Sequence, residues 1–288
     1  GLEPSVVTTS DAGAGVGYTG LRIRGSDITR INVTINGIPL NDPESHAVYW
    51  VDIPDFASSV NSLQIQRGVG SSTNGAGAFG ASMNLETNSF QVNPFGILSL
   101  GAGSFNTLKS SFQAGTGLIR DHWYFEGRGS AIRSDGYIDR ASSDLNSFFL
   151  QGGYYSDKTL IKAVVFGGKE KTYQAWYGTD AATLVTDRTF NWAGALYDEN
   201  WNVTDFYDNQ TDNYQQNHYQ LHLSQKLAHA LNLNLSGHYT HGQGYYEEYR
   251  QDEPFSDYGR DDGLIGTDTI HPTDLIRRRG LDTHVYGL

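Results

Sequence analysis

The 288-residue sequence contains no cysteine and a single methionine, so disulfide bonds and thiolate metal sites are excluded. No run approaches the roughly 18 apolar residues of a transmembrane helix. The 20 Lys and Arg against 32 Asp and Glu give a net charge of −12, which argues against a nucleic-acid partner. No G-x-S-x-G, H-E-x-x-H or Walker lysine occurs, so neither an enzyme nor a cofactor is expected.

Glycine and aromatic residues are abundant instead. The chain has 34 Gly, 18 Tyr and 13 Phe, with a mean hydropathy of −0.46. A transmembrane β-strand needs only about 9–11 residues of alternating polarity, a weaker signal than an apolar helix. The composition therefore fits a β-barrel membrane protein as well as a soluble all-β protein.

The stretch Leu21–Thr87 predicts a small β-rich unit. Asn36-Gly37 separates two apolar runs and has the form of a type I′ hairpin turn. Residues 62–66 alternate in polarity and stop at Arg67-Gly68, and residues 81–87 are predicted to be extended. The loop between them has too many glycines for a helix: Gly68, Gly70, Gly75, Gly77 and Gly80. Its G-x-G-x-x-G match does not indicate a dinucleotide site, because an extended segment follows where a helix is required.

This stretch resembles the plug domain of TonB-dependent outer-membrane transporters. The motifs that carry the likeness occur in the family's order: Ile23-Arg24-Gly25, Ile35-Asn36-Gly37-Ile38-Pro39-Leu40, Ile53-Pro54, Ile65-Gln66-Arg67-Gly68, the glycine run and Ser82-Met83-Asn84-Leu85-Glu86-Thr87. The resemblance implies an all-β membrane protein, with a small α+β plug domain at 1–90. Residues 91–288 would be the first strands of a transmembrane antiparallel barrel of about 22 strands. It also implies an internal piece of a longer protein, because the family's export signal, energy-coupling motif and remaining wall are missing.

Residues 93–288 form a series of alternating segments. The clearest is a hairpin of 217–227 and 231–240, which places the leucines on one face and the polar residues on the other. A soluble sandwich would turn the leucines to a core, and a barrel would turn them to lipid. The links at 105–107, 157–158 and 228–230 are short, and those at about 134–145, 170–215 and 243–280 are long. Short turns at one end and long loops at the other favour the barrel.

Three groups of residues are candidate sites. The resemblance implies that Arg24 and Arg67 contact glutamates of the barrel wall, whose positions the sequence does not identify. His222 and His238 lie diagonally on the polar face of the third hairpin and are weak metal candidates, with polar lining as the alternative. The aromatic residues of the long loops are candidates for ligand capture, for loop packing or for a membrane-interface girdle: Tyr173, Trp176, Tyr177, Trp192, Trp201, Tyr245, Tyr246 and Tyr249. The acidic residues of 243–280, such as Glu247 and Glu248, disfavour a polyanionic ligand.

The resemblance implies active import of a scarce solute across the cell outer membrane. The solute would be an iron-siderophore, haem or a cobalamin-like chelate, and the TonB-ExbB-ExbD complex would supply the energy. Outer-membrane lipid and lipopolysaccharide would surround the barrel. The sequences of the long loops are similar to those of Bacteroidetes-type receptors. Two alternatives remain open: a glycan or peptide importer with a surface lipoprotein lid, and a soluble β-rich carbohydrate-binding module.

Overall fold

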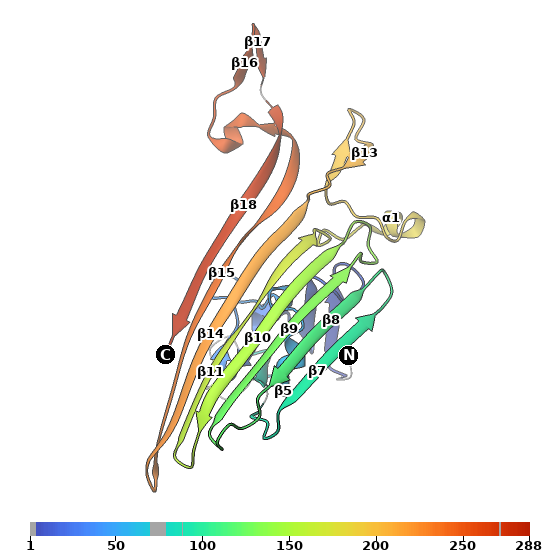
Figure 1. Cartoon of the computed structure of the whole chain (residues 1–288). Helices are drawn as coiled ribbons and strands as arrows, with labels where there is room; N and C mark the ends of the chain where they lie inside the picture. Colours follow the sequence, from blue (N-terminus) through green and yellow to red (C-terminus); the bar gives the residue numbers. More distant parts are fainter. Residues whose placement is uncertain (1–3, 70–78, 88, 271) are drawn as a thin grey trace.

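The larger sheet of the protein, which we call the wall, has eight antiparallel strands in chain order (Figure 1). The computed structural model describes residues 4–69, 79–87, 89–270 and 272–288. The wall strands are β7 (Phe95–Ala102), β8 (Leu108–Gly115), β9 (Trp123–Ser134), β10 (Ser143–Tyr155), β11 (Thr159–Tyr173), β14 (Thr211–Ala228), β15 (Leu231–Pro254) and β18 (Pro272–Gly287). Each strand pairs with its neighbours along the chain, so the wall is a continuous meander.

The two faces of the wall differ in polarity, as the alternation predicts. In β9, Trp123 and Phe125 are about half exposed, at 48% and 50%, whereas Tyr124 is fully buried. Leu221 and Leu235 lie on the same outer face and are 56% and 53% exposed. Within the described ranges no second layer of the chain covers these leucines, so the sandwich alternative does not fit. No helix among the described residues is long and apolar enough to cross a membrane.

The N-terminal unit is a four-stranded mixed sheet with strand order β4-β3-β6-β5. Its strands are β3 (Ile31–Ile35), β4 (Ile38–Pro39), β5 (Val60–Arg67) and β6 (Ala81–Thr87), preceded by the β1 (Val6–Ser10) and β2 (Thr19–Ile23) pair. All five residues of β3 are buried, and β3 runs parallel to β6. The short helices η1 (Ile28–Arg30), η2 (Trp50–Asp52) and η3 (Phe56–Ser59) connect these strands.

The predicted hairpin turn and the predicted strands of this unit are confirmed. Asn36 and Gly37 have φ angles of 54° and 80°, as a type I′ turn requires at both central positions. The strand before Gly68 ends at Arg67, and the extended segment after the glycine loop runs from Ala81 to Thr87. Most of that loop, residues 70–78, lies outside the described residues.

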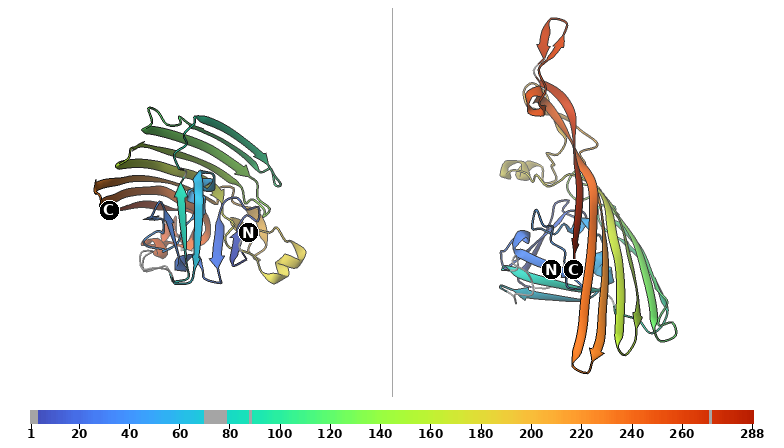
Figure 2. Two further views of the ribbon diagram at one scale, coloured as in Figure 1. Left: turned by 90° about the horizontal axis from the view of Figure 1, so that it is seen from below. Right: turned by 90° about the vertical axis from the view of Figure 1, so that its left-hand side faces the viewer.

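The wall curves around the N-terminal unit, which fills its concave side (Figure 2). We call the concave side the inner face and the N-terminal unit the plug. Phe56 of η3 packs on Phe166 and Phe149 of the wall, with ring centroids 4.7 and 6.3 Å apart. These rings join one buried cluster with Ile31, Val33 and Ile35 of β3 and the other plug residues. A single apolar core therefore spans the boundary between plug and wall.

The outer end of the wall is longer than the sequence suggests. β14, β15 and β18 continue well beyond the predicted segments, so the loops shrink to 174–210 and 255–271. Tyr173, Tyr245, Tyr246 and Tyr249 were predicted in loops but lie in strands. The remaining loops contain α1 (Ala181–Thr186), the β12 (Ala195–Tyr197) and β13 (Val203–Phe206) pair, η5 (Phe255–Tyr258), and the β16 (Gly263–Ile265) and β17 (Asp268–Ile270) pair.

The placement of one short turn is also corrected. The sequence groups 105–107 with the short turns at one end of the sheet, but this turn lies at the end that carries the long loops. The Phe105 carbonyl accepts a hydrogen bond from the Asp135 backbone N–H at 2.9 Å, and the Phe105 ring packs on Tyr137 of the next loop. The opposite end has the 116–122 link, which contacts β10 through a hydrogen bond from Tyr155 N–H to the His122 carbonyl at 2.8 Å.

Candidate ligand-binding site and plug–wall contacts

Asp55 anchors the plug to the wall through basic residues of β8 and β9. Its carboxylate accepts hydrogen bonds from Arg128 Nη1 at 2.8 Å and Ser130 Oγ at 2.7 Å, and it also pairs with Lys109 Nζ. Arg128 Nε donates to Ser59 Oγ of the plug at 2.8 Å. The side chains of Asp55 and Arg128 are only 4% and 2% exposed, so this ion pair is shielded from water.

The environment of Asp55 favours its charged form. Burial raises the pKa of the Asp55 carboxyl, but the hydrogen bonds from Lys109, Ser58 and Ser130 and the charge of Arg128 outweigh it. The resulting pKa lies below the ordinary value of 3.8. Asp55 is therefore ionised at neutral pH, and it neutralises part of the positive charge on the inner face.

The structure places Arg24 and Arg67 away from this contact. Arg24 is exposed, and none of the described carboxylates pairs with it; Arg67 Nη1 lies 3.4 Å from Ser5 Oγ within the plug. Their predicted glutamate partners remain a prediction. The observed plug–wall ion pair has the opposite polarity, with the acid on the plug and the bases on the wall. Sequence reasoning missed it, although Arg128 occupies an inward position of the β9 alternation, which was a usable signal.

A second plug–wall contact is rich in acids. Tyr18 of the plug donates from Oη to Asp212 Oδ2 of β14 at 2.5 Å, with Glu170 Oε1 of β11 at 3.4 Å. Asp52 of η2 lies near the same carboxylates and is 6% exposed. Burial, and then the negative charges of Asp212 and Asp42, raise the pKa of Asp52 well above 3.8. This side of the plug thus gathers buried acids, and no lysine or arginine among the described residues pairs with them as Arg128 pairs with Asp55.

Above the second contact, aromatic side chains from the plug and the wall meet. The Trp176 ring packs edge-on against Tyr18 of the plug, with ring centroids 5.3 Å apart. It also contacts Tyr177 at 6.3 Å and Tyr246 at 6.4 Å. The side chains of Trp176 and Tyr177 are 37% and 51% exposed, so their ring faces are open to a ligand. Trp176, Tyr177 and Tyr246 are the predicted ligand residues that the structure brings together over the plug.

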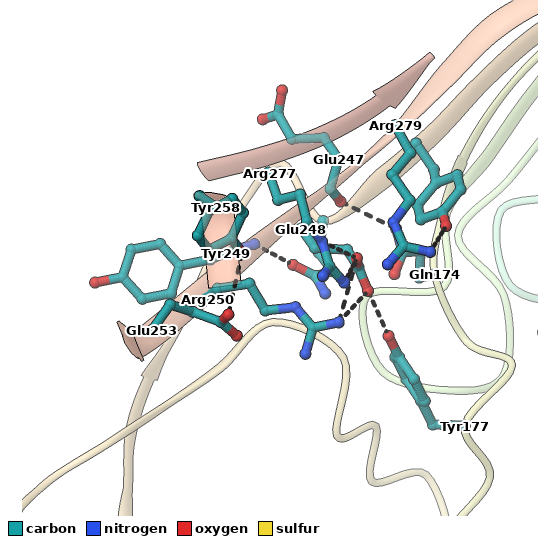
Figure 3. A network of polar contacts seen from close by, with 12 residues as sticks. Gln174, Tyr177, Glu247, Glu248, Tyr249, Arg250, Glu253, Tyr258, Arg277 and Arg279 are labelled. Carbon is teal, nitrogen blue, oxygen red and sulfur yellow. Dashed lines mark hydrogen bonds and ion pairs between the residues drawn. The ribbon is translucent and has the colours of Figure 1, made fainter. Parts of the chain in front are cut away.

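Arginines of β18 and acids of β15 pair across the same outer end (Figure 3). Glu248 accepts hydrogen bonds from Arg277 Nη2 at 2.6 Å and Tyr177 Oη at 3.0 Å, and Arg278 pairs with Glu247. The charges of Glu247 and Glu248 are therefore neutralised, so for these two acids the expected repulsion of an anionic ligand does not hold. Arg279 differs, because its Nη1 donates to Tyr246 Oη at 3.0 Å and none of the described carboxylates pairs with it.

The other predicted ligand residues have separate roles. Tyr173 is buried, and its Oη lies within hydrogen-bonding distance of the main-chain carbonyls of Tyr207 and Ala193, at 2.8 and 3.1 Å, which fixes the base of the loop. Tyr245 stacks under Arg278 with its centroid 4.8 Å from Cζ, and Tyr249 Oη donates to Asp274 at 2.6 Å. Trp192 and Trp201 pack on aromatic neighbours within the 174–210 loop, with ring centroids at 4.6 and 5.8 Å.

His222 and His238 lie on the inner face as predicted, but neither joins a group of three metal-ligating side chains among the described residues. His222 Nδ1 lies 2.9 Å from Ser236 Oγ, its cross-strand partner. The group of three that the described residues do form is His241, Asp282 and His284. These histidines were not singled out from the sequence, because the register between β15 and β18 brings them together.

Comparisons with known proteins agree with this arrangement. Residues 1–82 match the family model of the TonB-dependent receptor plug domain. No curated protein sequence matches the chain. Among solved structures, the unliganded ferric citrate transporter FecA is similar, with a TM-score of 0.63 and 15% identity over 85% of this chain. The siderophore receptor PirA from Acinetobacter baumannii matches with a TM-score of 0.61 and 14% identity over 98% of this chain. FpvA from P. aeruginosa, bound to a heterologous pyoverdine, matches with a TM-score of 0.60 and 13% identity over 87% of this chain.

These likenesses cover only part of each solved structure. The chain spans 39% of FecA, 40% of PirA and 32% of FpvA. At such identities the structural likeness establishes the fold, which is a plug seated in a barrel wall. The family match covers residues 1–82, so it identifies the N-terminal unit as a TonB-dependent receptor plug domain, and the eight-stranded sheet has the fold of part of a barrel wall.

Proposed function

We propose that this protein imports a scarce small-molecule chelate across the bacterial outer membrane. The observation that carries the proposal is a plug domain that fills the inner face of a wall whose outer face is apolar. A wall with leucines outside and polar residues inside suits a lipid environment and a wet interior. In this proposal residues 1–90 are the plug domain, and residues 91–288 belong to a transmembrane barrel in the cell outer membrane, in contact with lipid and lipopolysaccharide.

The proposed ligand is an anionic metal chelate such as an iron-siderophore. Arg279 offers donors that no described carboxylate occupies, and Tyr246, Trp176 and Tyr18 offer aromatic surface beside it. A guanidinium beside aromatic rings binds planar anionic groups well. Similar structures include a ferric citrate transporter and a pyoverdine receptor, which supports this substrate class. Haem and a cobalamin-like chelate are the other ligands that we propose. We also propose that the chain is a receptor of the Bacteroidetes type.

Arg279→Ala tests the ligand site. We expect the full-length receptor to bind its chelate about 10- to 100-fold more weakly, because a hydrogen bond to a charged group contributes about 1.5–3 kcal/mol. Isothermal titration with the chelate that co-purifies from iron-starved cells measures the change. Arg133→Ala is the matched control, because Arg133 is exposed and pairs with Asp144 on the wall. Equal affinities for the two variants would contradict the role of Arg279.

Import requires the plug to move, and in this proposal the TonB-ExbB-ExbD complex drives that movement. A disulfide between plug and wall tests this step. A Cβ at Gly17 of the plug would lie 3.7 Å from Ser143 Cβ of β10, close to the mean separation of about 3.8 Å in disulfides. The chain has no native cysteine, so the pair Gly17→Cys and Ser143→Cys would be the only thiols it contributes.

We expect the oxidised double variant to bind the chelate with unchanged affinity and to import none of it. Reduction should restore uptake, measured with a radiolabelled chelate in whole cells. Each single variant is a control, and Gly17→Cys alone reports any effect of a side chain at that left-handed position. Undiminished uptake with a fully formed disulfide would contradict a moving plug, and failure of binding would instead indicate a misplaced ligand site.

A further inference from the structure

Three metal-ligating side chains gather on the outer face of the wall, away from the plug. His241 belongs to β15, and Asp282 and His284 belong to β18. His241 shares its parity along β15 with the exposed residues Leu235 and Tyr239, so the strand alternation places it on the outer face. His241 and His284 are cross-strand partners. The cluster is therefore separate from the ligand site over the plug.

The geometry of the cluster matches the spacing of ligands around one metal ion. Asp282 Oδ1 lies 3.2 Å from His241 Nε2 and 3.4 Å from His284 Nε2. Two ligands at about 2.0–2.1 Å from a tetrahedral zinc ion are separated by about 3.3 Å. All three ligand atoms lie within 4.8 Å of one another. One ion can thus be reached by the three atoms through small side-chain rotations, without a change in the backbone.

The surroundings hold His284 in a ligating orientation. Tyr239 Oη lies 2.7 Å from His284 Nδ1, so that nitrogen is occupied and Nε2 is directed at Asp282. A hydrogen bond to one ring nitrogen fixes the tautomer that leaves the other free for a metal. The two imidazole rings are stacked, with centroids 4.5 Å apart and planes at 11°, so the His241 ring turns about its side-chain torsions to share an ion with His284. The side chains of Asp282 and His284 are 69% and 50% exposed, and the paired residues Asn217 and Gln243 are polar, so an ion can enter from water at this outer end of the wall.

We propose that His241, Asp282 and His284 form a binding site for a divalent transition metal of the zinc class. Two imidazoles and one carboxylate are a donor set that suits zinc, and three protein ligands leave a fourth position for water or another oxygen ligand. The bound ion joins β15 to β18 at the start of their outer extension. This role is independent of the chelate that the receptor imports.

Zinc titration of the full-length receptor tests the site. The metal-stripped protein in detergent is titrated with Zn²⁺ alone by calorimetry, and Co²⁺ is added separately because its absorption reports tetrahedral coordination. We expect one site in the wild type that Asp282→Asn and His284→Ala each remove. Tyr239→Phe should weaken it about tenfold, the lower end of the range for loss of a hydrogen-bond partner to a metal-bound histidine.

His229→Ala is the matched control, because His229 is exposed in the turn between β14 and β15 at the other end of the wall. It should bind Zn²⁺ like the wild type. The Tyr239→Phe variant keeps all three ligands, so its weaker binding supports the site even where a ligand variant fails to fold. A wild type without a micromolar site, or ligand variants that bind like the wild type, would show that the cluster is a hydrogen-bonded group only and overturn the proposal.

Discussion

Asp52 and Asp55 lie three residues apart in the plug, yet the wall receives them in opposite ways. Asp55 meets Arg128 and Lys109, and its negative charge is stabilised. Asp52 lies near Asp212, and its negative charge is disfavoured. The wall therefore holds the plug firmly on one side and weakly on the other. A plug that opens locally while the wall persists would begin to open on the Asp52 side.

The largest expected effect is that of Asp55→Ala. Removal of the carboxylate leaves the buried Arg128 without a partner, and loss of one member of a buried ion pair costs about 3–5 kcal/mol. We expect the plug to open more readily by about that free energy. Hydrogen exchange of the η3 amides, Phe56–Ser59, in the full-length receptor measures the opening.

Asp157→Ala is the control for this change, because Asp157 is exposed in the turn between β10 and β11. It removes the same charge without touching the plug, and its exchange rates should equal those of the wild type. If the η3 amides of Asp55→Ala also exchanged at the wild-type rate, the Asp55–Arg128 ion pair would not be what holds this side of the plug on the wall.

An intermediate effect is expected from Gly168→Ala on the inner face of β11. A Cβ at this position would lie 2.4 Å from the Asp52 carbonyl oxygen and 2.4 Å from Pro54 Cδ, so the plug backbone must move. Overpacking of this kind costs about 1–3 kcal/mol. Gly129→Ala is the control, because its Cβ would meet no atom of the described residues within 4 Å. Chemical denaturation of both variants measures the difference, and equal stabilities would show that plug and wall are not in close contact there.

The sequence predicts the features that depend on neighbouring residues. Asn36-Gly37 specifies its turn by the backbone freedom of those two residues, and the β9 alternation assigns Tyr124 and Arg128 to the inner face. The plug motifs predict the N-terminal unit correctly. These signals are local, so tertiary structure does not have to be known to interpret them.

The remaining features depend on register and on distant partners. The outer ends of β14 and β15 are polar on both faces, so residues such as Asn213 and Gln243 show no apolar period that predicts a strand. Asp55 and Arg128 are 73 residues apart, and no local pattern relates them. For the same reason the Arg279–Tyr246 contact and the His241–His284 pair emerge only from the ladder between β15 and β18.

The smallest expected effect is a difference in pH dependence between the two aspartates. The pKa of Asp55 is lowered in the folded protein, so its contribution to stability is complete above pH 3.8 and is lost as the pH falls through the folded pKa. The pKa of Asp52 is raised, so its contribution is complete below pH 3.8 and is lost as the pH rises through the folded pKa. The contact at Asp55 thus weakens as the pH falls, and the contact at Asp52 weakens as the pH rises.

Asp52→Asn separates the two contributions. The amide cannot ionise, so the variant should be more stable than the wild type at neutral pH, by about 1.4 kcal/mol for each unit by which folding raises the pKa of Asp52. Between pH 5 and 8 the stability of the variant should therefore lack the part of the pH dependence that the Asp52 carboxyl gives the wild type. Denaturation of the full-length receptor at several pH values measures this. A less stable variant at neutral pH would mean that the Asp52 carboxylate has a basic partner in the intact protein, and the two sides of the plug would then be held alike.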